Sequence, residues 1–213
     1  MNILQAISNY SEIPLSSELL LHELKSYSRP FDKIDELVKK GVLLQIKRGL
    51  YLPGPNIQMQ GPEPFLLANH LYGPSYVSLD AALSHWGLIP ERVYRTTSMS
   101  TKKSKVFNTA VGAFSYTKLS LPYYSYGVKQ VSLTSKQTVL MASPEKALCD
   151  KIITTTGLFL RSKKQTLAYL IEDLRIEKED LQPFDIKTMK TWISDSPKST
   201  SIHQLIETIA SFH

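Results

Sequence analysis

The chain has 213 residues, a length that suits one large or two small domains, and a formal net charge of +6 with a pI near 9.2. No apolar run approaches the ~18 residues of a membrane span, and the first residues lack the basic-then-apolar pattern of a secretory signal. The single cysteine, Cys149, excludes an internal disulfide framework. We therefore expect a cytoplasmic protein that does not bind a membrane. Its positive net charge modestly favours a polyanionic binding partner.

The first 28 residues predict two short helices. Residues 13–15 are expected to form a short extended piece, after which Ser16 or Ser17 caps a leucine-rich second helix. Residues 26–28 form a turn, so the next helix takes the recognition position of a helix-turn-helix. The first, amphipathic helix is indicated by apolar residues at helical spacing, namely Ile3, Leu4, Ile7 and Tyr10.

The next helix, residues 29–40, has clear start and stop signals. Ser28 can cap its first N–H groups, and Pro30 suits its first turn, where the missing N–H has no consequence. Gly41 supplies the left-handed residue at which the helix ends. One apolar face is predicted for this helix, made by Phe31, Ile34, Leu37 and Val38.

A short hairpin is predicted directly after Gly41. Val42, Leu44 and Ile46 alternate with Leu43, Gln45 and Lys47, as in a half-buried strand, and Lys47, Arg48 and Gly49 form the turn before the chain returns. A helix followed by a hairpin with two cations at its tip predicts a winged helix-turn-helix, which we assign to residues 1–58. Its partner would be double-stranded DNA.

In such a domain the start of the recognition helix points at base edges, and the wing meets phosphates or the adjacent minor groove. A domain used only for protein contacts is the alternative, because residues 1–60 hold seven Lys/Arg against six Asp/Glu, a weak excess for DNA binding. The candidate DNA-binding residues are Ser28, Arg29, Lys33, Lys39, Lys40, Lys47 and Arg48.

A stretch with four prolines and two glycines, residues 53–64, predicts a linker to a second domain over residues 59–213. We expect this domain to be strand-rich over 59–150 and helical over 151–213. The fold class is therefore α+β: a winged helix-turn-helix followed by a mixed domain with an antiparallel sheet and a helical C-terminal tail. Strands are expected at 76–77, 92–97, 105–111, 113–118, 128–131 and 138–141, and helices at 65–71, 78–86 and from 143 onward.

The excess of positive charge lies in the middle of the chain. Residues 61–151 carry ten Lys/Arg against five Asp/Glu, whereas residues 152–213 carry eight of each. The densest group lies in a polar stretch that indicates a solvated loop, and tyrosines that could stack on bases or on a protein follow it. The possible partner or nucleic-acid surface comprises Lys102, Lys103, Lys105, Tyr123, Tyr124 and Tyr126.

Catalytic and metal-binding patterns are weak. Ser143 and Lys146 form an S-x-x-K, but the intervening Pro-Glu indicates a helix start instead. Cys149 is expected to be a buried small hydrophobe, and His70 and His85 lack the clustering of a metal site. We expect no enzyme, no metal and no cofactor.

Three segments carry a resemblance to a known family: RGLYLPG (48–54), SYVSLDAALSHWGLIPE (75–91) and ASPEKALCDKI (142–152). In order and spacing they resemble the AbiEi-type antitoxins of type IV toxin–antitoxin systems, and the resemblance covers most of residues 1–155. None of the three is a catalytic signature, so the resemblance depends on their combination.

The resemblance implies an N-terminal winged helix that represses the shared operon, at an operator expected to hold inverted repeats. It also implies a C-terminal domain that counters a nucleotidyltransferase-like toxin. One alternative is a stand-alone transcriptional regulator whose C-terminal domain senses a ligand or partner. Another, a toxin-modifying enzyme, lacks a visible catalytic group.

Overall fold

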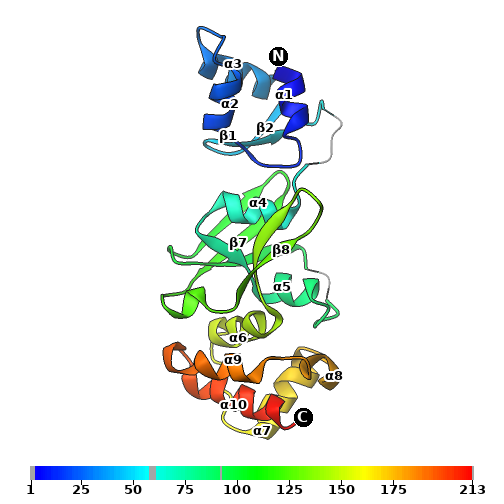
Figure 1. The fold of residues 1–213 in the computed structure, drawn as a ribbon, viewed down its shortest axis with the longest axis vertical. Helices are drawn as coiled ribbons and strands as arrows, with labels where there is room; N and C mark the ends of the chain where they lie inside the picture. The colour runs from blue at the N-terminus through cyan, green and yellow to red at the C-terminus, as the bar shows by residue number, and fades with distance from the viewer. Residues whose placement is uncertain (1–2, 58–60, 92, 213) are drawn as a thin grey trace.

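The computed structural model describes residues 3–57, 61–91 and 93–212. Figure 1 shows three regions stacked along the longest axis: a small helical region with the N-terminus, a β-sheet region, and a group of helices with the C-terminus. Helices and largely antiparallel strands in separate blocks make the fold α+β, which confirms the expected class. None of the described helices is long and apolar enough to cross a lipid bilayer.

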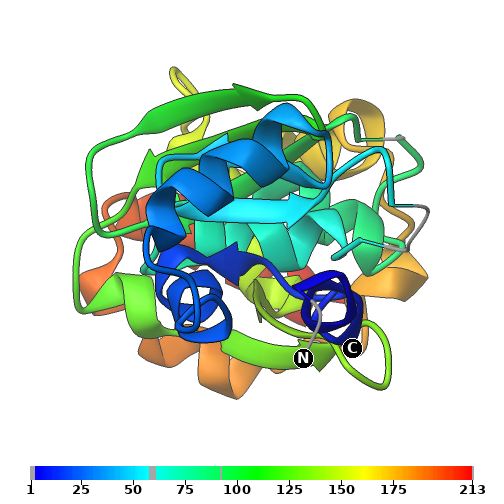
Figure 2. The same ribbon diagram turned by 90° about the horizontal axis from the view of Figure 1, so that it is seen from above.

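The N-terminal region is a winged helix. Its three-stranded sheet has β3 at the centre, paired antiparallel with both β1 and β2. Ser16 caps α2 as predicted, because its hydroxyl accepts a hydrogen bond from Leu19 N at 3.2 Å. Figure 2 shows α3 at the end of the molecule, in front of the other elements. In chain order the elements are α1 (Ile3–Asn9), β1 (Leu15–Ser16), α2 (Ser17–Glu23), α3 (Pro30–Lys39), β2 (Leu43–Lys47) and β3 (Leu50–Pro53).

Helix α3 starts one residue later than its predicted cap requires. Pro30 is its first residue and Arg29 is the N-cap, with no side-chain cap hydrogen bond. The expected cap by Ser28 is therefore wrong, because proline at the first helical position holds the residue before it outside the α region. At the other end, Gly41 has a φ of 65°, the left-handed stop that the sequence predicts.

The apolar face of α3 is buried only in part. Ile34 and Leu37 are buried in the core of the winged helix, and Val38 packs against it. Phe31 is 63% exposed, so the predicted apolar face extends beyond the buried core. The core ends one helical turn short of it, because the buried cluster of this region contains Ile34 but not Phe31.

The middle region is built on a six-stranded sheet in the order β6-β7-β5-β4-β9-β8. Helix α4 lies between this sheet and the winged helix, and α6 lies toward the C-terminal helices (Figure 1). Its strands are β4 (Ser75–Val77), β5 (Arg95–Ser100), β6 (Lys105–Thr109), β7 (Gly112–Lys118), β8 (Val128–Ser132) and β9 (Thr138–Ala142). Its helical elements are α4 (Pro64–Leu71), α5 (Leu79–His85), the short 3-10 helix η1 (Tyr123–Ser125) and α6 (Pro144–Thr154).

This sheet is mixed, whereas the sequence predicted an antiparallel one. Strand β7 pairs parallel with β5, and β9 pairs parallel with β4. The β6–β7 hairpin folds back so that β7, not β6, lies beside β5, and this gives β5 and β7 the same direction. Residue alternation within a strand indicates its buried face but does not identify its neighbour.

The C-terminal tail is helical, as predicted. It packs on α6 through α10, and one of its turns is π-helical, a form that is rare in proteins. The elements are α7 (Lys163–Ala168), the π-helical η2 (Tyr169–Asp173), α8 (Lys178–Leu181), α9 (Ile186–Thr191), the 3-10 helix η3 (Ile193–Asp195) and α10 (Ser199–Ala210).

Strand β3 contributes to two hydrophobic cores. Tyr51 belongs to the core of the winged helix, whereas Leu50 and Leu52 belong to the larger core of the middle and C-terminal regions. Because successive side chains of a strand point to opposite faces, the small sheet is buried on both sides. The winged helix therefore packs directly on the rest of the chain. The predicted boundary at residues 58/59 lies outside the described residues.

Candidate nucleic-acid interface

The cations of α3 are held mainly by carboxylates of the same helix. Arg29 pairs with Asp32 at 2.6 Å, and Glu36 accepts from both Lys33 at 2.9 Å and Lys40 at 2.6 Å. These two lysines lower the pKa of Glu36 to about 2, and the bond to Glu36 raises the pKa of Lys33. In the absence of a ligand, the positive charge of the predicted recognition helix is therefore largely neutralised within the helix itself.

The remaining predicted residues of this helix are exposed. Ser28 lies in the turn before α3, and Lys39 lies in its last turn. Within the described part of the chain, Lys39 has no carboxylate partner. It is thus the α3 cation most readily available to a polyanion.

The two predicted wing cations point to different surroundings. Arg48 and Gly49 form the turn between β2 and β3, which we call the wing turn; Gly49 has a φ of 82° and Arg48 is exposed. The Lys47 ammonium group instead donates to main-chain carbonyls at the end of α4, those of Leu71 and, at 3.4 Å, His70. Lys47 therefore joins the wing to the middle region, a role that its place in the sequence did not reveal.

A second cationic group lies beside this junction. Lys102, Lys103 and Lys105, which we call the lysine cluster, are all exposed, at and before the start of β6. Burial lowers the pKa of Lys47, and the nearby charges of Lys102 and Lys105 lower it further. The lysine cluster is thus close enough for its charges to act on Lys47, at the end of β2.

An aromatic platform supports the lysine cluster. The ammonium groups of Lys102 and Lys105 lie 5.4 Å and 5.8 Å from the ring centroid of Tyr72, and that of Lys105 lies 4.8 Å from the centroid of Phe107. The Tyr72 hydroxyl donates to the carbonyl of Lys103 at 3.1 Å. The hydrogen bond holds the backbone of the loop, and the cation–π contacts hold the ammonium groups of Lys102 and Lys105 beside the two rings.

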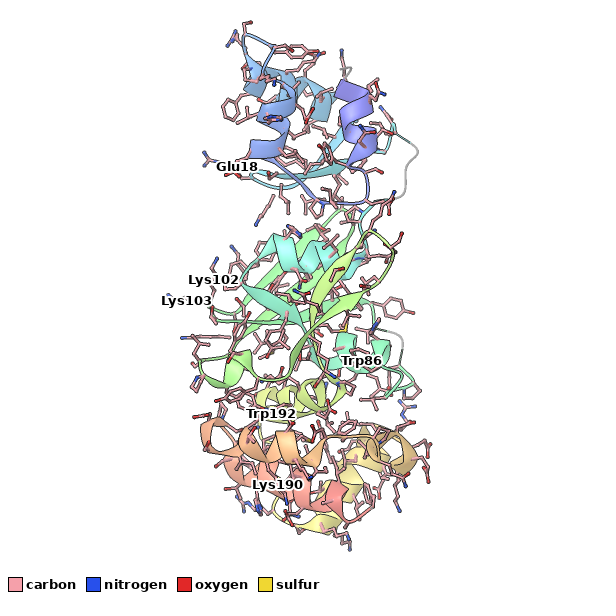
Figure 3. All side chains as sticks on the ribbon, viewed as in Figure 1. Glu18, Trp86, Lys102, Lys103, Lys190 and Trp192 are labelled. Atoms are coloured by element: carbon pink, nitrogen blue, oxygen red, sulfur yellow. The ribbon has the colours of Figure 1, made fainter. Side chains whose placement is uncertain are left out.

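Figure 3 shows Lys102 and Lys103 on the same side of the view as Glu18, in the first turn of α2. Ser17 N donates to the carbonyl of Gly49 at 3.1 Å, which keeps the start of α2 at the wing turn. The exposed Glu18 carboxylate therefore lies near the wing, where it opposes an approaching phosphate.

The three predicted tyrosines make contacts within the middle and C-terminal regions. Tyr123 is only 1% exposed, with the Lys146 ammonium group 3.5 Å from its ring centroid, so the structure removes it from the candidate surface. Tyr124 is half-buried against Tyr76. The Tyr126 hydroxyl donates to Asp195 in η3 at 2.6 Å, which ties this segment to the C-terminal helices.

The S-x-x-K residues belong to a buried structural network. Ser143 caps α6 by accepting from Lys146 N at 3.2 Å, and the Lys146 ammonium group pairs with Asp150 at 3.0 Å, both side chains being fully buried. Asp150 also accepts hydrogen bonds from Tyr76 at 2.9 Å and Ser78 at 2.8 Å. This ion pair was not among the predicted residues, although Lys and Asp at i and i+4 on one helix could have indicated it.

Burial governs the titration of this network. It lowers the pKa of Lys146 and raises that of Asp150, and their mutual attraction opposes both shifts. Burial also raises the pKa of Cys149 to about 12, so its thiol stays protonated at neutral pH. Among the described residues no group of His, Cys, Asp and Glu has the geometry to hold a metal ion.

A cleft with a volume of about 570 Å³ is lined by residues of α5, β5, α6 and η2, between the sheet and the C-terminal helices. Its charged groups are mostly paired: Lys151 with Asp80 at 2.7 Å, and Glu91 with Arg175. Arg175 and Leu79, the residue before Asp80, both adopt left-handed backbone conformations, with φ of 54° and 58°. Such conformations cost energy in residues other than glycine.

The chain matches no protein-family model and no curated protein. Among solved structures it is similar to the crystal structure of the RV2827C protein from Mycobacterium tuberculosis, with a TM-score of 0.54 and 15% sequence identity. The match covers 99% of this chain and 80% of that chain, so the likeness extends over all three regions. At this level of identity it establishes a shared α+β fold.

Proposed function

We propose that this protein binds double-stranded DNA through one continuous face, which extends from α3 across the wing turn to the lysine cluster. The observation that carries the proposal is the convergence of three cations where the wing meets the middle region: Lys47 donates to the carbonyl of Leu71, and Lys102 and Lys105 lie against the ring of the next residue, Tyr72. Duplex DNA carries phosphates at regular spacing, and a protein that neutralises several of them gains affinity from released counterions.

Each part of this face has a role that suits its chemistry. The exposed start of α3, with Arg29, would enter the major groove, and Arg48 at the wing turn would meet the phosphate backbone. The lysine cluster would follow the same backbone beyond the half-site. Its place in the fold accounts for the weak charge excess of residues 1–60, since part of the DNA-binding charge comes from the middle region.

We further propose that DNA binding represses the operon of the protein and that the middle and C-terminal regions counter a nucleotidyltransferase-like toxin in the cytoplasm. The support for this part is the resemblance of residues 48–54, 75–91 and 142–152 to the AbiEi-type antitoxins. The proposed action is not enzymatic, because Ser143 serves as a helix cap and Lys146 as the partner of Asp150.

The test of DNA binding compares two triple variants of the full chain with the same change in charge. A duplex is first selected from a random library by the wild-type protein, and its affinity is then measured at several salt concentrations. Replacing Lys102, Lys103 and Lys105 by alanine should reduce the slope of log affinity against log salt by about three, roughly one per lost phosphate contact.

The matched control replaces three lysines of the tail, Lys163, Lys164 and Lys178, which border a different groove. Equal slopes for the two triple variants would show that only net charge matters and would remove the lysine cluster from the interface. The antitoxin part is tested by expressing a neighbouring nucleotidyltransferase gene with and without this protein. Growth arrest that the protein does not relieve would contradict it.

A stand-alone regulator that senses a ligand is the second candidate. It is favoured by the cleft of about 570 Å³ and by the strained backbone at Leu79 and Arg175 on its borders. A genome in which no nucleotidyltransferase gene adjoins this one would favour this candidate over the antitoxin.

A further inference from the structure

Two aromatic side chains are exposed at the start of α3. Phe31, the second residue of the helix, is 63% exposed, and Tyr27, in the turn before it, is 43% exposed. Single exposed apolar residues are common on protein surfaces, so exposure alone indicates no function. Their position is informative, because in helix-turn-helix proteins this end of the recognition helix faces the base edges of the major groove.

The two aromatic residues differ in what already covers them. The Lys33 ammonium group lies 5.5 Å from the ring centroid of Tyr27, so one face of this ring already makes a cation–π contact. Phe31 follows Pro30, the first residue of α3. It precedes Asp32, whose carboxylate forms an ion pair with Arg29. Phe31 thus offers an exposed apolar surface beside the Arg29–Asp32 ion pair, in the first turn of α3.

The major groove exposes one apolar group, the C5-methyl of thymine, and an apolar side chain can contact it. We propose that Phe31 is a specificity-determining residue that reads a thymine methyl in the operator. This inference rests on the proposed DNA binding and adds to it a defined chemical feature of the DNA. The cations beside Phe31 would bring the helix to the phosphates, and Phe31 would then favour an A·T pair at one position of each half-site.

The experiment uses the full chain and a duplex that it selects from a random library. Each thymine of the duplex is replaced in turn by deoxyuridine, which pairs identically but lacks the methyl group. For the wild-type protein, one replacement per half-site should weaken binding about fourfold, the factor expected when one buried methyl group is lost. For Phe31→Ala the same replacement should have no effect, and Phe31→Leu should retain part of it.

Phe31→Ala is expected to fold normally, because the wild-type side chain is largely exposed and lies outside the core that the described residues form. Phe159→Ala is the matched control: this phenylalanine is 51% exposed but lies in the segment before α7, in the tail. It should keep the full deoxyuridine effect.

Identical deoxyuridine scans for wild type and Phe31→Ala would overturn the inference while leaving DNA binding intact. A loss of affinity in Phe31→Ala without any methyl dependence would also overturn it. If the wild-type chain enriched no sequence at all, the proposed function would fail and this inference with it.

Discussion

The Lys47 ammonium group donates to the main-chain carbonyl of Leu71, the last residue of α4. The last carbonyls of a helix have no partner within the helix, and they carry the negative end of its dipole. A residue that the sequence assigns to the tip of the wing thus completes the end of a helix in the next region. Its neighbour Arg48 stays exposed, so the two adjacent cations should respond differently to replacement.

We expect Lys47→Ala to lower the free energy of unfolding by ~1–3 kcal/mol, because it leaves helix-end carbonyls without a donor. Arg48→Ala should change stability by less than ~0.5 kcal/mol but should reduce the salt slope of DNA binding by about one. Urea denaturation and binding titrations on both variants check this. A larger loss of stability in Arg48→Ala than in Lys47→Ala would reverse the assignment.

Asp32 should restrain DNA binding. It holds Arg29 at 2.6 Å, and Arg29 must leave it to reach a base. Asp32→Asn should therefore strengthen operator binding, by roughly the fewfold that a surface ion pair is worth. In the Arg29→Ala background, the same substitution should produce a smaller gain. Equal gains in both backgrounds would indicate that Asp32 acts only by repelling phosphates.

Glu18 should weaken the wing contact by simple repulsion. Its carboxylate is exposed in the first turn of α2, next to the wing turn. Glu18→Gln should raise affinity for any DNA sequence roughly twofold, as expected for one unit charge about 8 Å from a phosphate in water. The gain should shrink as salt screens the charge. A gain confined to the operator would point instead to a base contact.

The isolated winged helix should be less stable than the same residues in the full chain. A fragment of residues 1–57 exposes Leu50 and Leu52, which are otherwise buried in the larger core. Each such leucine contributes ~1.5–3 kcal/mol when buried. Urea denaturation of the fragment, monitored by circular dichroism, should show an unfolding midpoint at low urea concentration or no cooperative transition at all. A fragment that unfolds at the same urea concentration as the full chain would show that β3 does not need its second partner.

The Lys146–Asp150 pair should be sensitive to loss of either partner. Asp150→Ala or Lys146→Ala leaves an uncompensated buried charge, and the expected cost is ~3–5 kcal/mol. Replacing both, by Lys146→Met and Asp150→Leu, should recover part of that stability, although the buried hydroxyls of Tyr76 and Ser78 lose their acceptor. Denaturation midpoints of the three variants decide the matter, and a double variant no better than the single ones would contradict the coupling. DNA affinity of the folded double variant should be unchanged, since the pair lies away from the candidate interface.

Local patterns predicted the local elements well. Gly41 as a helix stop and Ser16 as one of the two candidate caps are encoded by neighbouring residues, and the structure confirms both. The alternation predicted for β2 is wrong in its faces, because Leu43 is buried in the core of the winged helix while Leu44 and Ile46 pack against the larger core. The order of strands in the large sheet was not predictable in this way, because pairing depends on residues far apart in the chain.

The candidate site was predictable in its residue types but not in its geometry. A cation at a turn indicates an exposed charge, but Lys47 meets a helix end more than twenty residues away in the chain. An aromatic at helical spacing indicates a core, but Phe31 lies past the end of that core. Tyr123 was predicted to lie on the surface. It is buried because Lys146, from a helix distant in the sequence, packs over its ring.

The position of β3 in both cores limits how the protein can adjust to its target. A DNA-binding domain on a free tether can accept variable spacing between its contacts, whereas a domain that shares a strand with its neighbour cannot. The wing and the lysine cluster should therefore contact phosphates at a fixed spacing along the duplex. Inserting one base pair between the two sets of contacted phosphates should weaken binding, and lengthening the chain between β3 and α4 should not restore it.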